Sequence, residues 1–201
     1  MCGKTIREES FADLFRKEDI LCAKCRGEWN RNPRRFRFAG HEAYTIYEYE
    51  GGFAKSLLQY KECCDEALRD VFLYPDRARL ARAWRKRTLV LLPSSEQKKR
   101  ERGFSHLRQM FSCLNLPMIE PFEKTEAGTQ KMRSAKERRR MQEGIRLLAG
   151  QKIPGRIVLA DDVITTGATM KGALAALPEG TDVRVFACAF TRAPQEDSAR
   201  G

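Results

Sequence analysis

The segment from Arg156 to Leu177 constrains the fold more than any other part of this sequence. Arg156–Ala160 (RIVLA) is a short apolar run of the kind that forms a buried parallel strand. Two acidic residues, two threonines and a glycine follow, and then Met170, Leu174 and Leu177 recur at helical spacing. A strand, a turn and a helix in this order form half of a doubly wound α/β unit.

Similar patterns elsewhere extend this unit to most of the chain. Continuous or alternating apolar runs predict strands, and apolar residues at helical spacing predict helices. The further predicted elements are strands at Tyr44–Tyr49, Thr88–Leu92 and Val183–Phe190, a helix at Phe53–Leu73, and a helix over about residues 104–114. We therefore expect an α/β fold with a mostly parallel central sheet flanked by helices.

The residues after Ala160 have the chemistry of a phosphate site. A helix N-terminus offers unpaired N–H groups to an anion, Gly167 allows close approach of the backbone, and the threonines add hydroxyl donors. Asp161 and Asp162 would repel a phosphate unless they have another partner, such as the vicinal diol of a sugar or Mg²⁺. The alternative is a helix cap and tight turn with an acidic pair that faces solvent.

The run from Asp161 to Thr169 (DDVITTGAT) resembles the signature of the type I phosphoribosyltransferases. This resemblance implies a phosphoribosyltransferase fold and binding of phosphoribosyl pyrophosphate with Mg²⁺. It also implies that Asp161 and Asp162 hold the ribose hydroxyls. The 5′-phosphate would then be held by Val163, Thr165, Thr166, Gly167, Ala168 and Thr169.

Other motifs are similar to those of the ComF family (competence protein F-like), over about residues 44–190. They are Lys99–Phe104, Thr129–Lys131 followed by Arg133–Arg140, and Tyr49-Glu50-Gly51 followed by Tyr60-Lys61. The resemblance implies that Arg100 and Arg102 receive the pyrophosphate, that Lys131 lies on a closing loop, and that the protein takes part in DNA uptake during natural competence. The alternative for Arg102 and Lys131 is that they are solvated surface charges.

The chain departs from the ComF pattern next to the predicted pyrophosphate loop. Leu91-Leu92-Pro93-Ser94 stands where the family usually has Pro-Val-Pro, and Ser105-His106 stands where it usually has Asn-Gln. We expect His106 on a helix surface or partly buried, with a ligand contact possible. Because the phosphate and ribose motif is intact, binding is better supported than catalysis.

The N-terminal segment contains an incomplete set of zinc ligands. Cys22 and Cys25 form a C-x-x-C pair and Cys2 adds a third thiol, whereas a structural zinc site needs four ligands. An incorrectly assigned start codon, a contribution from His41, or loss of the metal would each account for the difference. We expect three parts: a cysteine-bearing segment (1–40), a phosphoribosyltransferase-like domain (41–193) and a polar tail (194–201).

Charge and composition suggest partners and location. The chain has 38 Lys and Arg against 27 Asp and Glu, a net charge of +11, which attracts anions. The sequence contains no apolar run long enough to span a membrane and its start lacks an apolar secretory core, so we expect a cytoplasmic protein.

The polar stretch Lys124–Gly144 predicts a lid or a disordered segment. Its basic run Lys136–Arg140 would either bind nucleic-acid phosphates or form a solvated lid helix.

A second function is therefore open. The protein would be a ligand sensor or an accessory that handles single-stranded DNA with the competence machinery, on the same fold and without catalysing transfer.

Overall fold

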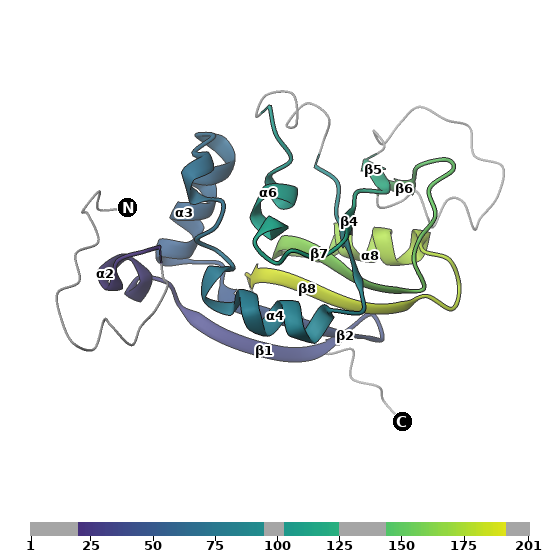
Figure 1. Cartoon of the computed structure of the whole chain (residues 1–201), viewed down its shortest axis with the longest axis horizontal. Coiled ribbons are helices and arrows are strands. Elements are labelled where there is room, and N and C mark those ends of the chain that lie inside the picture. Colours follow the sequence, from purple (N-terminus) through teal and green to yellow (C-terminus); the bar gives the residue numbers. More distant parts are fainter. Residues whose placement is uncertain (1–19, 95–102, 125–143, 192–201) are drawn as a thin grey trace.

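The computed structural model describes residues 20–94, 103–124 and 144–191, and a six-stranded sheet forms its centre (Figure 1). The strands are β1 (Arg31–Phe38), β2 (His41–Glu48), β3 (Thr88–Leu91), β4 (Met118–Ile119), β7 (Arg156–Ile164) and β8 (Asp182–Phe190). Their order is β1-β2-β8-β7-β3-β4, and every neighbouring pair is parallel except the hairpin β1–β2. The prediction of a mixed α/β fold with a mostly parallel central sheet is confirmed.

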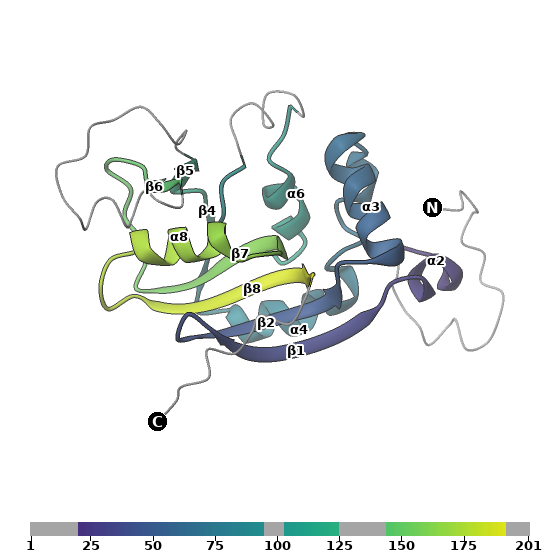
Figure 2. The same cartoon turned by 180° about the vertical axis from the view of Figure 1, so that it is seen from behind.

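Helices cover both faces of the sheet. The helices of the described residues are α2 (Ala23–Gly27), α3 (Gly51–Glu62), α4 (Arg77–Trp84), α6 (His106–Ser112) and α8 (Ala168–Ala176), of which α2 lies beyond the end of the sheet (Figure 1). Trp84 of α4 and Phe111 of α6 pack edge-on against Phe186 of β8, with centroid distances of 4.8 and 5.8 Å, so α4 and α6 share one face. Helix α8 covers the opposite face, beside the small antiparallel pair β5 (Phe122–Lys124) and β6 (Ile145–Leu147) (Figure 2). Across the described ranges, no helix combines the length and the apolar character needed to cross a membrane.

Strand β7 is longer than the sequence predicted. Its pairing with β8 continues to the Ile164–Phe190 register, four residues beyond Ala160. Asp161 and Asp162 therefore lie inside the strand and do not follow it as expected. Because successive side chains of a strand leave on opposite faces, the two carboxylates face different environments.

The helix predicted at Phe53–Leu73 is wrong in its second half. Helix α3 ends at Glu62, and Cys64 has a left-handed backbone with φ 53°. Two short 3₁₀ turns follow, η1 (Glu66–Leu68) and η2 (Tyr74–Asp76). Leu68, Val71 and Phe72, whose spacing suggested a longer helix, are buried, but irregular backbone brings them to the core, while Cys64 of the same pattern is exposed. Helical spacing alone therefore misled the prediction.

The described part of the N-terminal segment packs onto the domain. Trp29 is 5% exposed; it stacks on Phe72 and meets Tyr47 and Phe53 edge-on, with centroid distances of 5.0–5.6 Å. Arg31–Phe38, which the sequence analysis placed in the N-terminal segment, forms the edge strand of the main sheet. Pro33 is accommodated there because an edge strand tolerates a missing N–H.

Candidate functional site

A pocket of about 200 Å³ lies at the carboxyl ends of β3 and β7. Its lining residues come from six separate segments of the chain. They are Lys61, Leu92, Pro93, Ser94, His106, Leu107, Lys124, Asp161, Asp162 and Thr169. Open α/β sheets bind their ligands at this edge. Three residues of the predicted ligand motif, Asp161, Asp162 and Thr169, are thus brought together with cationic side chains from elsewhere in the chain.

Asp162 is buried and has two partners. Its side chain is 7% exposed, Lys61 Nζ donates to its Oδ2 at 2.8 Å, and His106 Nε2 lies 2.6 Å from the same oxygen. Burial alone would raise the pKa of this carboxyl, but the Lys61 charge and the His106 hydrogen bond outweigh burial and hold the pKa below its usual value. Asp162 is therefore an anion at neutral pH, held by side chains from α3 and α6.

His106 connects Asp162 to the segment after β3. Because an ionised carboxylate only accepts hydrogen bonds, Nε2 of His106 carries the proton. Nδ1 lies 3.3 Å from Ser94 Oγ, and in the neutral ring it accepts the hydroxyl proton. His106 is 4% exposed, so the expected helix-surface position is wrong. The ring can be buried because the Asp162 carboxylate accepts a hydrogen bond from its Nε2.

Asp161 has a different electrostatic environment from its neighbour. Its Oδ1 accepts a hydrogen bond from the backbone N–H of Asp162 at 2.9 Å. Burial raises the pKa of Asp161 to about 7, the Asp162 charge adds to this increase, and the charges of Lys61 and Lys124 oppose it. Asp161 therefore gains or loses its proton near neutral pH, whereas Asp162 stays ionised.

The loop between β7 and α8 presents backbone donors. Gly167 is the N-cap of α8, with φ 74° and ψ 7°, and its carbonyl accepts the first helical hydrogen bond from Lys171 N–H at 2.8 Å. Within the described part of the chain, the N–H groups of Thr166 and Gly167 donate to no protein acceptor. These donors are available to an external anion at the start of a helix.

Phe38, at the end of β1, packs against this loop. A Cβ added to Gly167 would lie 2.6 and 2.7 Å from two atoms of the Phe38 ring, which is 4% exposed. The positive φ and the contact with Phe38 both require glycine at this position. The hairpin β1–β2 therefore helps to shape the loop, a contribution that the sequence did not indicate.

The remaining predicted residues divide into two groups. Val163 is half-buried in β7, Thr165 and Thr166 are exposed in the loop, and Ala168 begins α8. The other group lies outside the described residues, where its predicted roles stay predictions; it consists of Cys2, Arg100, Arg102, Lys131 and the run Lys136–Arg140.

Sequence reasoning missed most of the polar partners in the pocket. Lys61 entered only as part of a family-like Tyr60-Lys61 pair, and Ser94 and Lys124 were given no role. Lys61 and Asp162 are 101 positions apart, so no local pattern connects them. The signal that the sequence offered for Lys61 was its place after Tyr60 in the pair that resembles the family.

The described residues contain no cluster of side chains suited to hold a metal ion. Across the described ranges, no three His, Cys, Asp or Glu side chains gather as a metal site would require. Cys22 occupies the N-cap position of α2 without a side-chain capping hydrogen bond and Cys25 is buried within the helix, while Cys2 is not described. Zinc binding by these three thiols therefore stays a prediction.

Comparison with known proteins adds to this geometry. No protein-family model matches the chain. The chain is 26% identical over 144 residues to the competence protein ComFC of Streptococcus pneumoniae (strain ATCC BAA-255 / R6). The alignment covers 71% of this chain and 65% of ComFC, so the chain spans less than two thirds of that relative's length. Together with the motifs in the sequence, this similarity supports the assignment of the chain to the ComF family.

Proposed function

We propose that the pocket binds phosphoribosyl pyrophosphate, or a related phosphorylated ribose, and that the protein is a Mg²⁺-dependent enzyme of the phosphoribosyltransferase type. One observation carries this proposal: the strand that holds two pocket carboxylates leads into a turn where the backbone donors of Thr166 and Gly167 are open. The similarity to ComFC supports a competence-related role. We further propose that the protein acts in the cytoplasm with the competence machinery.

Residues of the loop after β7 and residues of β7 itself would bind different parts of the ligand. The N–H groups of Thr166 and Gly167 would donate to the 5′-phosphate, with the Thr169 hydroxyl beside them. Asp161 and the free oxygen of Asp162 would accept hydrogen bonds from the ribose hydroxyls. Because Lys61 and His106 already hold one oxygen of Asp162, this carboxylate is positioned before the ligand arrives.

The leaving pyrophosphate needs positive charge around it, since negative charge accumulates there as the bond to C1′ breaks. Lys61 and Lys124 supply cations at the pocket, and the family resemblance adds Arg102 and Lys131. The carboxylate donors of the pocket and the diphosphate oxygens are the ligand type that Mg²⁺ prefers. Bound Mg²⁺ would neutralise part of the diphosphate charge.

Calorimetric titration with phosphoribosyl pyrophosphate and Mg²⁺ tests the proposal. We expect binding by the wild type and a loss of about 100-fold or more in Asp161→Asn/Asp162→Asn, since each charge-assisted hydrogen bond contributes about 1.5–3 kcal/mol. Asp182→Asn, a half-exposed carboxylate on β8, is the control and should bind as the wild type does. Equal affinity in the double variant would remove the proposed ribose contacts.

Ligand affinity should depend on pH through Asp161. With a pKa of about 7, the carboxyl is mostly ionised at pH 8 and mostly protonated at pH 6. If the Asp161 carboxylate accepts a hydrogen bond from a ribose hydroxyl, ligand binding should weaken by about tenfold from pH 8 to pH 6, because the ionised fraction of Asp161 falls by that factor. Asp161→Asn should retain only the pH dependence of the phosphate itself, which also protonates near pH 6. An unchanged profile in this variant would exclude Asp161 as the titrating group.

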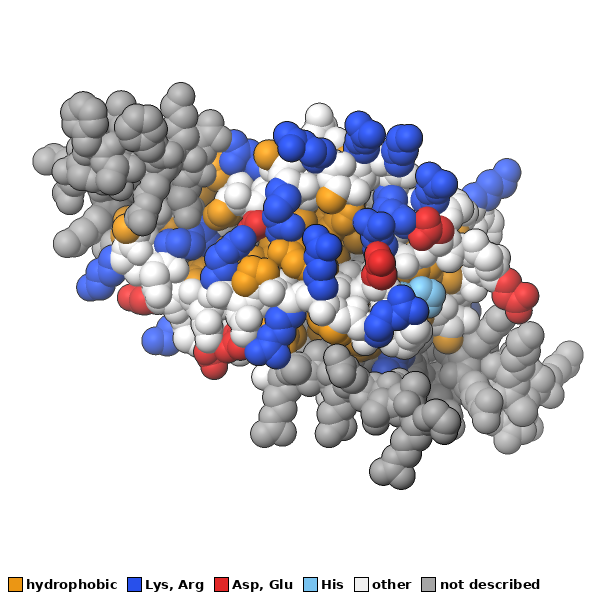
Figure 3. All heavy atoms as spheres, turned by 90° about the horizontal axis from the view of Figure 1, so that it is seen from below, with side chains coloured by type: hydrophobic (Ala, Val, Ile, Leu, Met, Phe, Trp, Pro, Cys, Tyr) orange, Lys and Arg blue, Asp and Glu red, His pale blue; other side chains and the backbone are white. Residues whose placement is uncertain are grey.

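The second candidate function is an accessory that handles single-stranded DNA on the same fold. It is favoured by exposed arginines on β1 (Arg35 and Arg37) and α4 (Arg79 and Arg82), which do not line the pocket (Figure 3 shows this side of the molecule), and by the departures from the family pattern around Ser94 and His106. Pyrophosphate release in the presence of candidate bases would support the enzyme. Salt-sensitive binding to single-stranded DNA without turnover would support the accessory.

A further inference from the structure

A serine, a histidine and an aspartate form a continuous series of polar contacts in the pocket. Ser94 Oγ lies 3.3 Å from His106 Nδ1, and His106 Nε2 lies 2.6 Å from Asp162 Oδ2. Ser94 follows β3, His106 begins α6 and Asp162 lies within β7, and all three residues line the pocket. A hydroxyl, an imidazole and a carboxylate in this sequence of contacts form the arrangement that activates serine nucleophiles.

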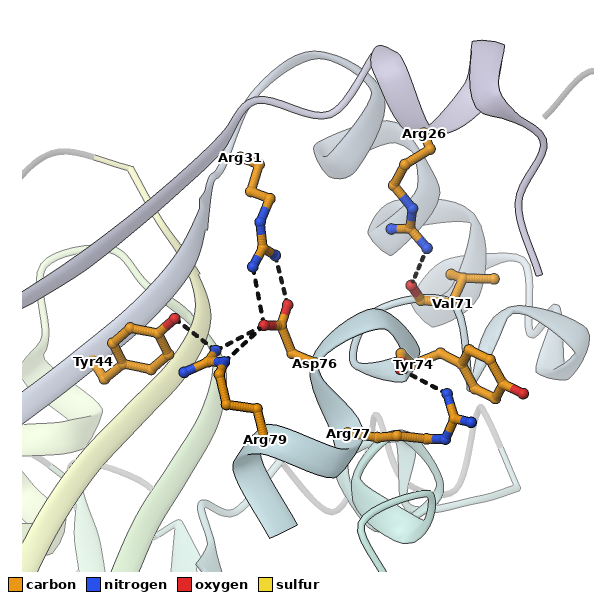
Figure 4. A network of polar contacts seen from close by, with 8 residues as sticks. All are labelled: Arg26, Arg31, Tyr44, Val71, Tyr74, Asp76, Arg77 and Arg79. Atoms are coloured by element: carbon orange, nitrogen blue, oxygen red, sulfur yellow. Dashed lines mark hydrogen bonds and ion pairs between the residues drawn. The ribbon is translucent and has the colours of Figure 1, made fainter. Parts of the chain in front are cut away.

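A second buried carboxylate provides a comparison within the same protein. Asp76 is 4% exposed, and it accepts hydrogen bonds from Arg31 at 2.5 and 3.0 Å and from Arg79 at 2.8 and 3.1 Å (Figure 4). Both partners are guanidinium groups, which keep their protons, so this network orients side chains but transfers no proton. Asp162 differs, because one of its partners is an imidazole whose other ring nitrogen faces a hydroxyl.

The surroundings of His106 hold its ring in place. The His106 carbonyl accepts a hydrogen bond from the buried Tyr60 hydroxyl at 2.8 Å, which fixes the start of α6 against α3. Asp162 accepts the proton of Nε2, so Nδ1 is left to accept a proton from Ser94. The same carboxylate stabilises the positive charge that the ring acquires when Nδ1 takes up that proton. His106 is therefore oriented as a base toward Ser94 before any substrate binds.

Ser94 is the member of this series that a substrate reaches most readily. It is half-buried at the pocket, whereas His106 and Asp162 are buried. Lys124 also lines the pocket, and its ammonium offers positive charge to the oxyanion that forms when a carbonyl is attacked. Ser94 and His106 both lie where the chain departs from the ComF pattern, so the family resemblance does not account for this pair.

We propose that Ser94 is a nucleophile that takes an acyl group from a small anionic ester, with His106 as the general base and Asp162 as the residue that positions it. Ser94 Oγ bonds to the carbonyl carbon while its proton passes to His106 Nδ1. The bond from that carbon to the leaving oxygen then breaks, and the leaving alkoxide takes the proton from Nδ1. Water attacks the acyl-serine through the same two proton transfers, which releases a carboxylic acid and restores the Ser94 hydroxyl.

The pocket indicates the class of substrate. Its volume of about 200 Å³ restricts the acyl group to a small one, and Lys61 and Lys124 attract an anion. The open N–H groups of Thr166 and Gly167 suit a phosphate on the alcohol part of the ester. This choice of a phosphorylated alcohol rests on the phosphate site of the proposed function, whereas the reactivity of Ser94 does not.

The test is covalent labelling of the full chain with a fluorophosphonate probe, located by peptide mass spectrometry. Ser94 Oγ bonds to phosphorus, fluoride leaves and His106 takes up the proton, so we expect the adduct on Ser94. His106→Gln retains a donor for Asp162 and an acceptor for Ser94 but takes up no proton, so the labelling rate should fall by about 100-fold or more. The matched control is Ser112→Ala, which removes an exposed hydroxyl that donates to the Gln109 carbonyl at 2.7 Å, and it should label as the wild type does.

Asp162→Asn tests the positioning role. The amide can donate to Nε2, which turns the ring to the tautomer with its proton on Nδ1, so labelling should again fall by about 100-fold or more. Combined with His106→Gln it should cause no further loss, because the two residues act as a unit. Separate losses that add in the double variant would overturn the positioning role.

The acyl step has its own measurement. With 4-nitrophenyl acetate, the wild type should release 4-nitrophenol and carry an acetyl group on Ser94, and Ser94→Ala should carry none at this position. An adduct on another serine, wild-type labelling in His106→Gln, or a Ser94 that gains no acetyl group would overturn the proposal. Neither measurement uses phosphoribosyl pyrophosphate, so a negative result here leaves the calorimetric test of the proposed function unaffected, and the reverse also holds.

Discussion

Replacing Gly167 with alanine is expected to lower the free energy of unfolding by about 2–5 kcal/mol and to weaken binding of the pocket ligand by more than tenfold. The φ of 74° costs a non-glycine residue about 1–2 kcal/mol. The new Cβ would also lie 2.6 Å from the Phe38 ring, and overpacking of this kind costs about 1–3 kcal/mol. Because the buried Phe38 ring is 4% exposed and has little room to move, we expect the loop to shift and to carry the open N–H groups with it.

Gly180→Ala separates the two causes. Gly180 has φ 80°, but a Cβ there would meet no atom within 4 Å, so this variant carries the backbone cost alone. Urea denaturation should therefore show a smaller loss of stability for Gly180→Ala, with unchanged ligand affinity. In the variant Gly167→Ala/Phe38→Ala the overlap is gone, so the combined loss should be smaller than the sum of the two single losses. Additive losses would show that Phe38 does not shape the loop.

The sequence predicted the fold class well because its signals are local. Strands Thr88–Leu91 and Asp182–Phe190 appear as apolar runs, and the turn after Ile164 is marked by Thr and Gly. The end of α3 could not be predicted in this way. Leu68 and Phe72 keep helical spacing, but Cys64 takes a left-handed backbone, and tertiary contacts bring these residues to the core.

The site was predictable only where its residues are contiguous. Asp161, Asp162 and Thr169 belong to one motif, so a single segment indicated their place. Lys61 and His106 reach Asp162 from 101 and 56 positions away, and only the packing of α3 and α6 on the same face brings them together. The contacts around Tyr44 have the same origin, because Arg35 of β1 and Arg79 of α4 approach its ring from distant parts of the sequence.

Replacing Asp162 with alanine is expected to lower the free energy of unfolding by about 3–5 kcal/mol, the usual cost of removing one partner from a buried ion pair. The Lys61 ammonium, whose side chain is 23% exposed, would lose its carboxylate, and the buried His106 ring would lose the acceptor for Nε2. Asp182→Ala is the matched control. Asp182 pairs with Arg87, the residue before β3, at 2.8 Å, but the Asp182 side chain is 50% exposed, so we expect a loss of at most about 1 kcal/mol.

The pH dependence of this loss distinguishes a lost charge from lost packing. The folded state lowers the pKa of Asp162 relative to its unfolded value near 4, so the stabilisation is fully present above pH 4. It declines as the pH falls below 4 toward the folded pKa, because the wild-type carboxyl then takes up a proton. The difference between wild type and Asp162→Ala should therefore shrink in acid, as measured by urea denaturation from pH 7 to pH 3. A difference that stays constant over this range would mean that the Asp162 side chain stabilises the site by packing and not by its charge.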